Sequence, residues 1–219
     1  MENILEVQQI CKSFPKTKFV LDKVSFSIPY GSIMGFVGEN GAGKTTTIGC
    51  ILNTISKDSG TIKLFGKELS DADTELRENI GVVYDGDNFP AYWTAEQLAH
   101  VMQGLYKKWD NALFHQYLED FRLLPKQKIK HYSRGMTMKL AVAAALSHHP
   151  QLLILDEATS GLDPIMRDDM LDVFLDFVQE ETHSILLSSH ITTDLEKVAD
   201  YITFIHNGKL IMTATKNDL

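Results

Sequence analysis

The sequence is poor in cysteine, lacks a long apolar run and carries no excess of positive charge. Its two cysteines, Cys11 and Cys50, have no C-x-x-C spacing, so we expect reduced thiols in a cytosolic protein rather than a disulfide framework. The N-terminus shows neither the basic start nor the apolar stretch of a signal peptide. The longest apolar runs, such as residues 140–146, are much shorter than the ~20 residues of a membrane-spanning helix. If this protein works at a membrane, we expect another chain to cross it.

Acidic residues outnumber basic ones, which gives a formal net charge of −8 over 219 residues. No basic stripe is present to neutralise phosphates, so we expect no nucleic-acid partner. Attachment to anionic lipid by charge alone is disfavoured for the same reason. Apolar residues make up 44% of the chain, which is enough for a substantial core, and the length fits a single domain.

Apolar segments of two kinds predict an α/β fold. Residues 4–10 and 19–28 alternate in polarity, as half-buried strands do. Later strands are short continuous apolar runs at residues 32–37, 81–84, 151–155 and 184–187. Helical patterns separate these runs, so we expect a largely parallel sheet. Residues 94–124 read as a helical insertion, and Asn207-Gly208 predicts a final hairpin.

Two helix starts are marked by capping residues. Thr94 and Gln97 have the spacing of a capping box. Asp163 followed by Pro164 combines a favourable N-cap with a residue suited to the first helical position. We therefore expect helices to begin after Thr94 and after Asp163.

A glycine-rich loop follows the predicted strand at residues 32–37. Its residues Gly38, Glu39, Asn40, Gly41, Ala42, Gly43, Lys44 and Thr45 match the phosphate-binding pattern G-x-x-x-x-G-K-[ST], and Thr46 continues into a helix. Glycines let backbone N–H groups approach phosphate oxygens, and the helix directs its positive dipole end at the anion. Lys44 supplies a positive charge to the β- and γ-phosphates, and the Thr45 hydroxyl suits Mg²⁺. No Asn-Lys-x-Asp guanine motif occurs, which favours ATP.

Two carboxylates, Asp156 and Glu157, end the apolar strand at residues 151–155. Ligands of open α/β sheets collect at the carboxyl ends of strands. Asp156 is therefore a candidate Mg²⁺ ligand, and Glu157 is a candidate base for an attacking water. The alternative is that the two acids simply end a strand and face solvent, which the upstream phosphate loop disfavours.

The order of these motifs resembles that of the ATP-binding cassette (ABC) ATPases, over essentially the whole chain. The resemblance implies one domain, residues 1–219, with a RecA-like P-loop NTPase core, an antiparallel β subdomain and a helical subdomain at about residues 87–135. The family's signature Leu-Ser-Gly-Gly-Gln corresponds to Tyr132-Ser133-Arg134-Gly135-Met136. Ser133 and Gly135 match it and are implied to reach the γ-phosphate held by a partner subunit. Arg134 and Met136 resemble a variant of export-type bacterial cassettes.

The resemblance assigns further residues to the site. His190 lies where the family places a histidine against the γ-phosphate, although a lone histidine at a strand end is more often solvated. Phe14 matches the aromatic that stacks on adenine; the alternative is a core aromatic, since Phe19 lies nearby. Asp85 stands where the family has a glutamine that links Mg²⁺ or water to the membrane subunit. Asp85 is therefore a candidate metal ligand with altered coupling to that subunit.

The resemblance also implies a function and partners. It describes an ATP-hydrolysing motor subunit of an ABC-type membrane transporter, held at the cytoplasmic face of the membrane by separate transmembrane permease subunits. Two cassettes, identical or different, would close around two ATP with Mg²⁺, and Lys44, Glu157 and His190 would catalyse hydrolysis. In such cassettes membrane subunits dock near the aromatic-rich residues 89–93, so we expect an exposed aromatic patch there.

Two alternative functions stay open. One is a regulatory or weakly hydrolysing cassette, which Asp85 and the imperfect signature favour. The other is a soluble ABC ATPase that acts on DNA or the ribosome rather than in transport. The single cassette, the ordinary helical insertion and the acidic charge disfavour that second alternative.

Overall fold

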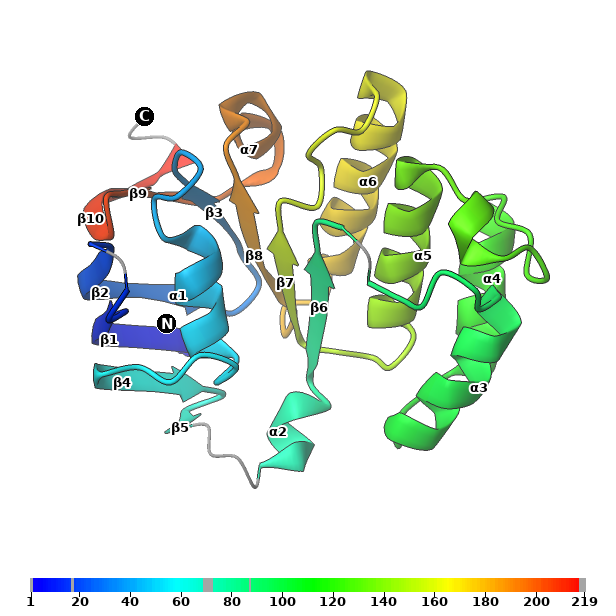
Figure 1. The fold of residues 1–219 in the computed structure, drawn as a ribbon, viewed down its shortest axis with the longest axis horizontal. Coiled ribbons are helices and arrows are strands. Elements are labelled where there is room, and N and C mark those ends of the chain that lie inside the picture. The colour runs from blue at the N-terminus through cyan, green and yellow to red at the C-terminus, as the bar shows by residue number, and fades with distance from the viewer. Residues whose placement is uncertain (1, 17, 69–72, 87, 217–219) are drawn as a thin grey trace.

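The computed structural model describes residues 2–16, 18–68, 73–86 and 88–216, which form two sheets and the helices around them (Figure 1). The larger sheet has the strand order β10-β9-β3-β8-β7-β6. Its strands are β3 (Ile33–Val37), β6 (Ile80–Tyr84), β7 (Leu152–Asp156), β8 (Ser184–Ser189), β9 (Tyr201–His206) and β10 (Lys209–Thr215). Neighbouring strands run parallel except in the β9–β10 hairpin at one edge. The predicted, largely parallel sheet is confirmed.

The central strands are apolar because both of their faces are covered. Every residue of β3, β7 and β8 is buried, as expected of parallel strands packed between helices. The helices α5 (Arg134–Leu146), α6 (Pro164–Phe177) and α7 (Thr192–Val198) cover one face. Helix α1 (Lys44–Ile51) covers the other face (Figure 1).

A second sheet shares a buried core with α1 and with the larger sheet. Its strands β1 (Asn3–Ser13), β2 (Val20–Pro29), β4 (Ser59–Leu64) and β5 (Lys67–Glu68) are antiparallel, in the order β2-β1-β4-β5. Leu5 and Leu21 of this sheet share one buried core with Ile48 of α1 and Phe36 of β3. The helix that follows the phosphate loop is therefore held between the two sheets.

The helical insertion is broken where the sequence pattern predicted continuity. The chain forms α3 (Ala95–Leu105) and α4 (Asn111–Asp120), with α2 (Thr74–Arg77) before β6 and a 3₁₀ turn at Ile129–His131 after α4. Between α3 and α4 the backbone is extended at Tyr106 and Asp110. The Asp110 carboxylate accepts the N–H of Leu113 at 2.9 Å and so starts a new helix. Asp87, with which the predicted helical subdomain begins, lies outside the described residues.

The two predicted helix starts are confirmed. Thr94 and Gln97 form a reciprocal capping box, with N–H to side-chain distances of 3.0 and 3.2 Å. The Asp163 carboxylate accepts the N–H of Met166 at 3.1 Å, with Pro164 in the first helical position of α6. Among the described residues, no helix has the length and apolar character that crossing a bilayer requires.

Candidate active site

The phosphate loop, residues 38–45, joins the carboxyl end of β3 to the start of α1. Gly41 and Gly43 have φ angles of 83° and 114°, which other residues rarely adopt. A Cβ atom at Gly38 would lie 2.5 Å from the carbonyl oxygen of Ile205, so close packing also requires glycine there. Gly43 supplies no capping side chain to α1, so the N–H groups of the first turn can bind an anion.

Lys44 is buried beneath this loop although it carries a charge. Its ammonium donates to the carbonyl oxygens of Gly38 at 2.5 Å and Glu39 at 3.2 Å. It also pairs with Glu157, with 3.0 Å between Nζ and Oε1. A buried charge needs such partners to offset its lost hydration. The loop and the acidic strand end predicted from the sequence are thus brought together.

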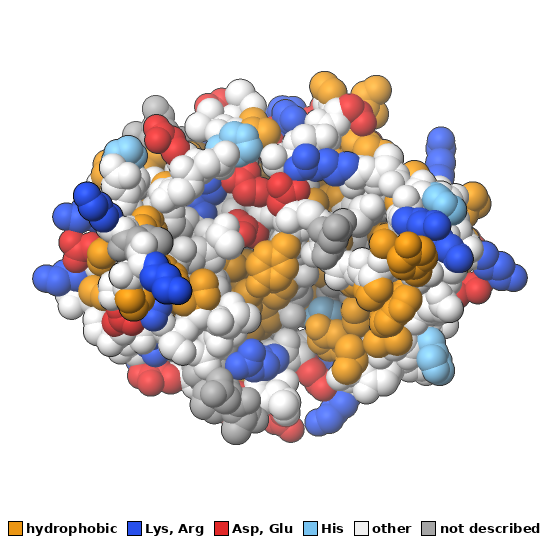
Figure 2. All heavy atoms as spheres, in the orientation of Figure 1, with side chains coloured by type: hydrophobic (Ala, Val, Ile, Leu, Met, Phe, Trp, Pro, Cys, Tyr) orange, Lys and Arg blue, Asp and Glu red, His pale blue; other side chains and the backbone are white. Residues whose placement is uncertain are grey.

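Asp156, the last residue of β7, connects three elements through its carboxylate. Oδ2 accepts the Thr45 hydroxyl at 2.8 Å, and Oδ1 accepts the Ser188 hydroxyl at 2.5 Å. Ser188 belongs to β8, which lies between β7 and β3 in the sheet. Figure 2 shows acidic side chains gathered in the upper middle of the face, near the upper ends of β6 and β7 in Figure 1.

The oxygen atoms of Thr45 and Asp156 fit Mg²⁺. This ion prefers oxygen ligands and is usually held by one or two protein groups together with substrate phosphates and water. Among the described residues, no group of three or more His, Cys, Asp or Glu is arranged for a metal ion. A hydroxyl and a carboxylate 2.8 Å apart, beside a phosphate loop, therefore match a nucleotide-bound Mg²⁺ rather than an all-protein metal site.

Glu157 adopts a left-handed backbone with φ of 56°, which is costly for a residue with a side chain and often marks a functional site. Its N–H donates to the carbonyl oxygen of Ser188 at 3.1 Å. One carboxylate oxygen pairs with Lys44, and the other lies 2.7 Å from Nδ1 of His190. His190 is 43% exposed. A carboxylate is thus held between an ammonium and an imidazole at the open edge of the site.

A cavity of about 330 Å³ lies beside the loop. It is lined by Phe19, Glu39, Asn40, Gly41, Gly43, Lys44, Thr45, Thr46 and Glu157. The aromatic ring in this lining is that of Phe19, whose Cζ would lie 2.9 Å from a Cβ at Gly43. Phe14 is not part of the lining, and the Lys12 ammonium lies 5.5 Å from its ring centroid. Adenine stacking on Phe14 stays a prediction, and Phe19 becomes a second candidate.

Ser133 and Gly135 lie at the start of α5 and are not among the residues that line this cavity. The Ser133 hydroxyl caps the helix by accepting the N–H of Met136 at 3.2 Å. Gly135 is buried, and a Cβ there would collide with the sulfur of Met166 on α6. A hydroxyl and N–H groups at a helix start suit a phosphate. Neither residue lines the cavity, so the structure shows no phosphate contact for them within this chain, and that contact stays a prediction.

Asp85 follows β6, and its carboxylate is paired with Arg134 of α5 at 2.6 Å. Its backbone N–H donates to the carbonyl oxygen of Asp156 at 2.9 Å, so its main chain adjoins the candidate metal site. The preceding Tyr84 has a raised pKa, mainly because it is partly buried and further because of the Asp156 carboxylate. Mg²⁺ ligation by Asp85 stays a prediction, and in this structure one oxygen of its carboxylate is paired with Arg134.

The aromatic residues 89–93 form a smaller exposed patch than predicted. Tyr92 is 71% exposed. Phe89 and Trp93 are partly buried against the core that α3, α4 and α5 share. Phe89 and Asp85 also line a second cavity of about 370 Å³. The exposed aromatic surface of residues 89–93 is therefore the ring of Tyr92, next in sequence to residues that line this second cavity.

Comparison with known proteins identifies the family. Residues 21–160 match the ABC transporter family. This chain belongs to that family. It is 36% identical over 216 residues to the bacitracin transport ATP-binding protein BcrA of Bacillus licheniformis, covering 96% of this chain and 69% of BcrA. It is 34% identical to the lantibiotic transport ATP-binding protein SrtF of Streptococcus pyogenes, covering 95% of this chain and 90% of SrtF.

The fold of this ABC cassette is found in solved structures as well. The structure of an ATP binding subunit of an ABC transporter superposes with a TM-score of 0.85 at 27% sequence identity, covering 98% of this chain and 91% of that subunit. The predicted P-loop NTPase architecture and the predicted resemblance to ABC ATPases are both confirmed.

Two residues of this ABC cassette's site were not singled out from the sequence. Ser188 bonds both Asp156 and the backbone of Glu157, but in the sequence it is one of two serines ending a strand. In the sequence, Phe19 is distinguished only by its proximity to Phe14. A polar residue ending a fully buried strand next to the acidic one is the signal that could have identified Ser188.

Proposed function

We propose that this ABC cassette binds and hydrolyses ATP as the motor subunit of a membrane transporter. The observation that carries the proposal is the convergence of Lys44, Thr45, Asp156, Glu157 and His190 at one edge of the sheet. The Thr45 hydroxyl lies 2.8 Å from the Asp156 carboxylate, and the Glu157 carboxylate lies 3.0 Å from Lys44 and 2.7 Å from His190. These are the groups that a phosphoryl transfer to water needs: a cation, oxygen ligands for Mg²⁺ and a base.

The phosphate loop and Lys44 bind the triphosphate. The N–H groups at the start of α1 contact phosphate oxygens, and Lys44 exchanges its bond with Glu157 for oxygens of the β- and γ-phosphates. Thr45 and Asp156 hold Mg²⁺, which when bound neutralises charge on those phosphates. The exchange at Lys44 leaves the Glu157 carboxylate available to a water molecule.

Glu157 is the proposed general base. It takes a proton from water as the water oxygen bonds to the γ-phosphorus and the bond from that phosphorus to the β–γ bridging oxygen breaks. The electron pair leaves with ADP, and the products are ADP and inorganic phosphate. His190 fixes the orientation of the carboxylate, and Lys44 stabilises negative charge on the transferred group.

A second cassette, identical or different, is proposed to complete each site with Ser133 and Gly135. Closure of two cassettes around two ATP adds their phosphate contacts, so ATP has a higher affinity for the closed pair. Hydrolysis removes that difference, and the pair reopens. The resulting movement is the mechanical output of the cassette.

Separate permease subunits are proposed to receive that movement at the cytoplasmic face of the membrane. The names of BcrA and SrtF, which refer to bacitracin and lantibiotic transport, support this role. The second cavity, lined by Asp85, Phe89, Lys130 and Tyr132 among others, is the proposed docking surface, with the exposed Tyr92 nearby in the sequence. The permeases contact the transported molecule, so the proposal for this chain concerns the motor.

Phosphate release from the purified chain with ATP and Mg²⁺ tests the proposal. We expect measurable turnover that Lys44→Ala abolishes together with nucleotide binding. ATP binding without turnover would instead support the regulatory cassette. Failure to bind ATP at millimolar concentration would overturn both. Co-purification with a permease from the same cell would then establish the coupling to transport.

A further inference from the structure

The ion pair between Asp85 and Arg134 joins two positions at which this chain departs from the ABC pattern. Arg134 Nη2 lies 2.6 Å from Asp85 Oδ1. The two residues are 49 positions apart in the chain, so the fold brings them together. By the resemblance described above, Arg134 stands at the position of a signature glycine and Asp85 at the position of a glutamine. Their contact therefore links two substitutions that are unrelated in the sequence.

The guanidinium of Arg134 also lies against a third segment. A Cβ atom at Gly161 would be 2.5 Å from Nη1 and 2.6 Å from Cζ of Arg134. Gly161, with φ of 68°, lies in the loop that leads from Glu157 to α6. One side chain thus contacts the end of β6, the loop after β7 and the helix on which it sits. Two of these segments adjoin the candidate active site, because the Asp85 N–H donates to the Asp156 carbonyl oxygen at 2.9 Å and the loop begins at Glu157.

The energetics indicate a role in geometry rather than in stability. Arg134 is the first residue of α5, where the helix dipole disfavours a cation. The Asp85 carboxylate offsets that cost, and a guanidinium fork fixes direction better than a lysine does. The two side chains are 52% and 39% exposed, and such exposed pairs contribute little to the free energy of unfolding.

We propose that Arg134 is a positioning residue, held by Asp85 and Gly161, that sets the place of Ser133 and Gly135 for the partner's nucleotide. The inference rests on the proposed function, in which those two residues complete a site across two cassettes. In this proposal Asp85 holds the Arg134 side chain and does not bind Mg²⁺. If Asp85 acts by holding Arg134, variants of Arg134 should impair ATP-dependent dimerisation. If Asp85 acts as a Mg²⁺ ligand, variants of Arg134 should not impair it.

The test measures the ATP concentration that gives half-maximal dimerisation, by light scattering, in a Glu157→Gln parent that holds ATP without hydrolysis. Arg134→Gln and Asp85→Asn should each raise that concentration by about three- to tenfold, as expected for contacting residues. The double variant should be no worse than either single one. Exchanging the charges, Asp85→Arg with Arg134→Asp, should recover most of the loss, and Arg134→Lys should lie between the parent and Arg134→Gln.

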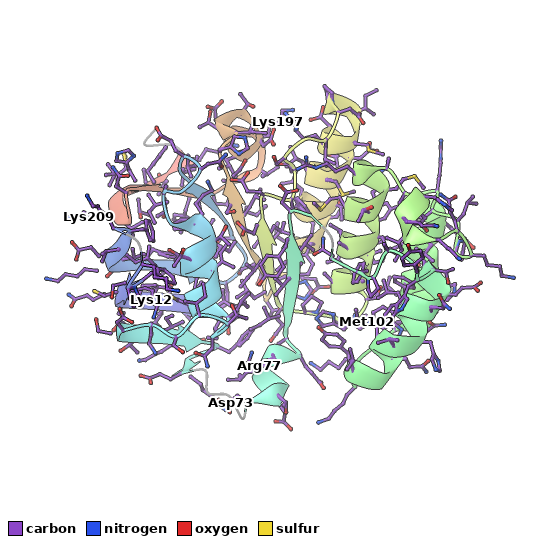
Figure 3. All side chains as sticks on the ribbon, viewed as in Figure 1. Lys12, Asp73, Arg77, Met102, Lys197 and Lys209 are labelled. Carbon is purple, nitrogen blue, oxygen red and sulfur yellow. The ribbon has the colours of Figure 1, made fainter. Side chains whose placement is uncertain are left out.

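A matched pair elsewhere provides the control. Lys197 of α7, labelled in Figure 3, pairs with Asp168 of α6 at 2.6 Å, and their side chains are 55% and 59% exposed. Lys197→Gln and Asp168→Asn should leave the ATP concentration for dimerisation unchanged. Thermal unfolding midpoints within about 3 °C of the parent show that each variant is folded, since a weak exposed pair changes stability little.

The outcomes separate this inference from the proposed function. If the parent associates with ATP and Arg134→Gln matches it, the inference alone fails. If Asp85→Asn raises the ATP requirement and Arg134→Gln does not, Asp85 acts as a metal ligand and the positioning role is overturned. If the two single effects add in the double variant, the pair is not a unit and the inference fails. If the parent shows no ATP-dependent association with itself, the inference fails for a pair of identical cassettes, while ATP binding and phosphate release by the wild type test the motor function separately.

Discussion

Glu157 is the residue on which the proposed chemistry depends, because its carboxylate contacts both Lys44 at 3.0 Å and His190 at 2.7 Å. We predict that Glu157→Gln lowers ATP turnover at least about 100-fold, since an amide does not accept the proton of the attacking water. The variant should bind ATP at least as tightly as the wild type, because no carboxylate competes for Lys44. Phosphate release and a fluorescent-nucleotide titration measure the two effects. Normal hydrolysis in this variant would refute the assigned base.

Phe19 and Phe14 give a second prediction at the scale of single residues. Phe19 lines the cavity of the phosphate loop, whereas the ring of Phe14 faces the Lys12 ammonium. We predict that Phe19→Ala weakens ATP binding by about 5- to 50-fold, the loss of one base–aromatic stack. Phe14→Ala should have a smaller effect. Equilibrium titration of each variant with ATP decides between them, and a larger loss for Phe14→Ala would return the stacking role to that residue.

Site residues that belong to a local sequence motif could be predicted from the sequence. Site residues whose contacts depend on the tertiary fold could not. The phosphate loop fixes Lys44 and Thr45 by local geometry, and the strand end fixes Asp156. The roles of Ser188 and Arg134 depend instead on which strands are neighbours and on where α5 begins relative to β6. No local pattern encodes those contacts, so the structure was needed to find them.

At the scale of elements, His148 ties the end of α5 to the start of β6. Its Nε2 lies 3.2 Å from the carbonyl oxygen of Ile80, and its ring stacks on Tyr106 with centroids 4.1 Å apart. Burial is the main cause that lowers the pKa of this imidazole below its ordinary value of about 6.5. The folded protein therefore favours the neutral ring, and below pH 6.5 the unfolded chain binds more protons than the folded one.

The resulting prediction concerns acid stability. The stabilisation from neutral His148 is complete above pH 6.5 and is lost as the pH falls through the lower, folded pKa, by at most about 1.4 kcal/mol per pH unit. His148→Gln should remove this part of the pH dependence, because glutamine does not titrate. Urea unfolding of both proteins from pH 5 to pH 8 measures it. Parallel stability curves for the two proteins would contradict the prediction.

The helices that begin at the capping residues Thr94 and Asp163 were predicted correctly. The break between α3 and α4 was not predicted. Thr94 and Asp163 start helices because their side chains accept N–H groups that otherwise have no partner. Asp110 does the same at the start of α4. Nothing in the apolar spacing around it indicated that the chain stops being helical at Tyr106. The break also contacts residues just after α5, where Tyr106 stacks on His148 and the Asp110 N–H donates to the Ser147 carbonyl oxygen at 2.7 Å.

At the scale of the whole molecule, the alternation of strands and helices was sufficient to predict the fold class. It did not show which of the predicted site residues lie together within one chain and which lie elsewhere. The phosphate loop and the acidic strand end meet within one chain, because the ends of parallel strands lie at one edge of a sheet. The start of α5, with Ser133, lies outside that cavity lining. In the proposed function, a complete site therefore needs a second cassette, whose Ser133 and Gly135 contact the nucleotide of the first.

This division predicts how activity depends on protein concentration. If a second cassette completes the site, ATP turnover per chain should rise with concentration while the protein is mainly monomeric, and reach a plateau as dimers form. Light scattering on the same samples gives the monomer fraction, so the two curves can be compared directly. Lys44→Ala should be inactive at every concentration. Constant turnover per chain, in samples that light scattering shows to be monomeric, would mean that one cassette hydrolyses ATP by itself. In that case Ser133 and Gly135, which do not line the cavity of their own chain, would not be needed for hydrolysis.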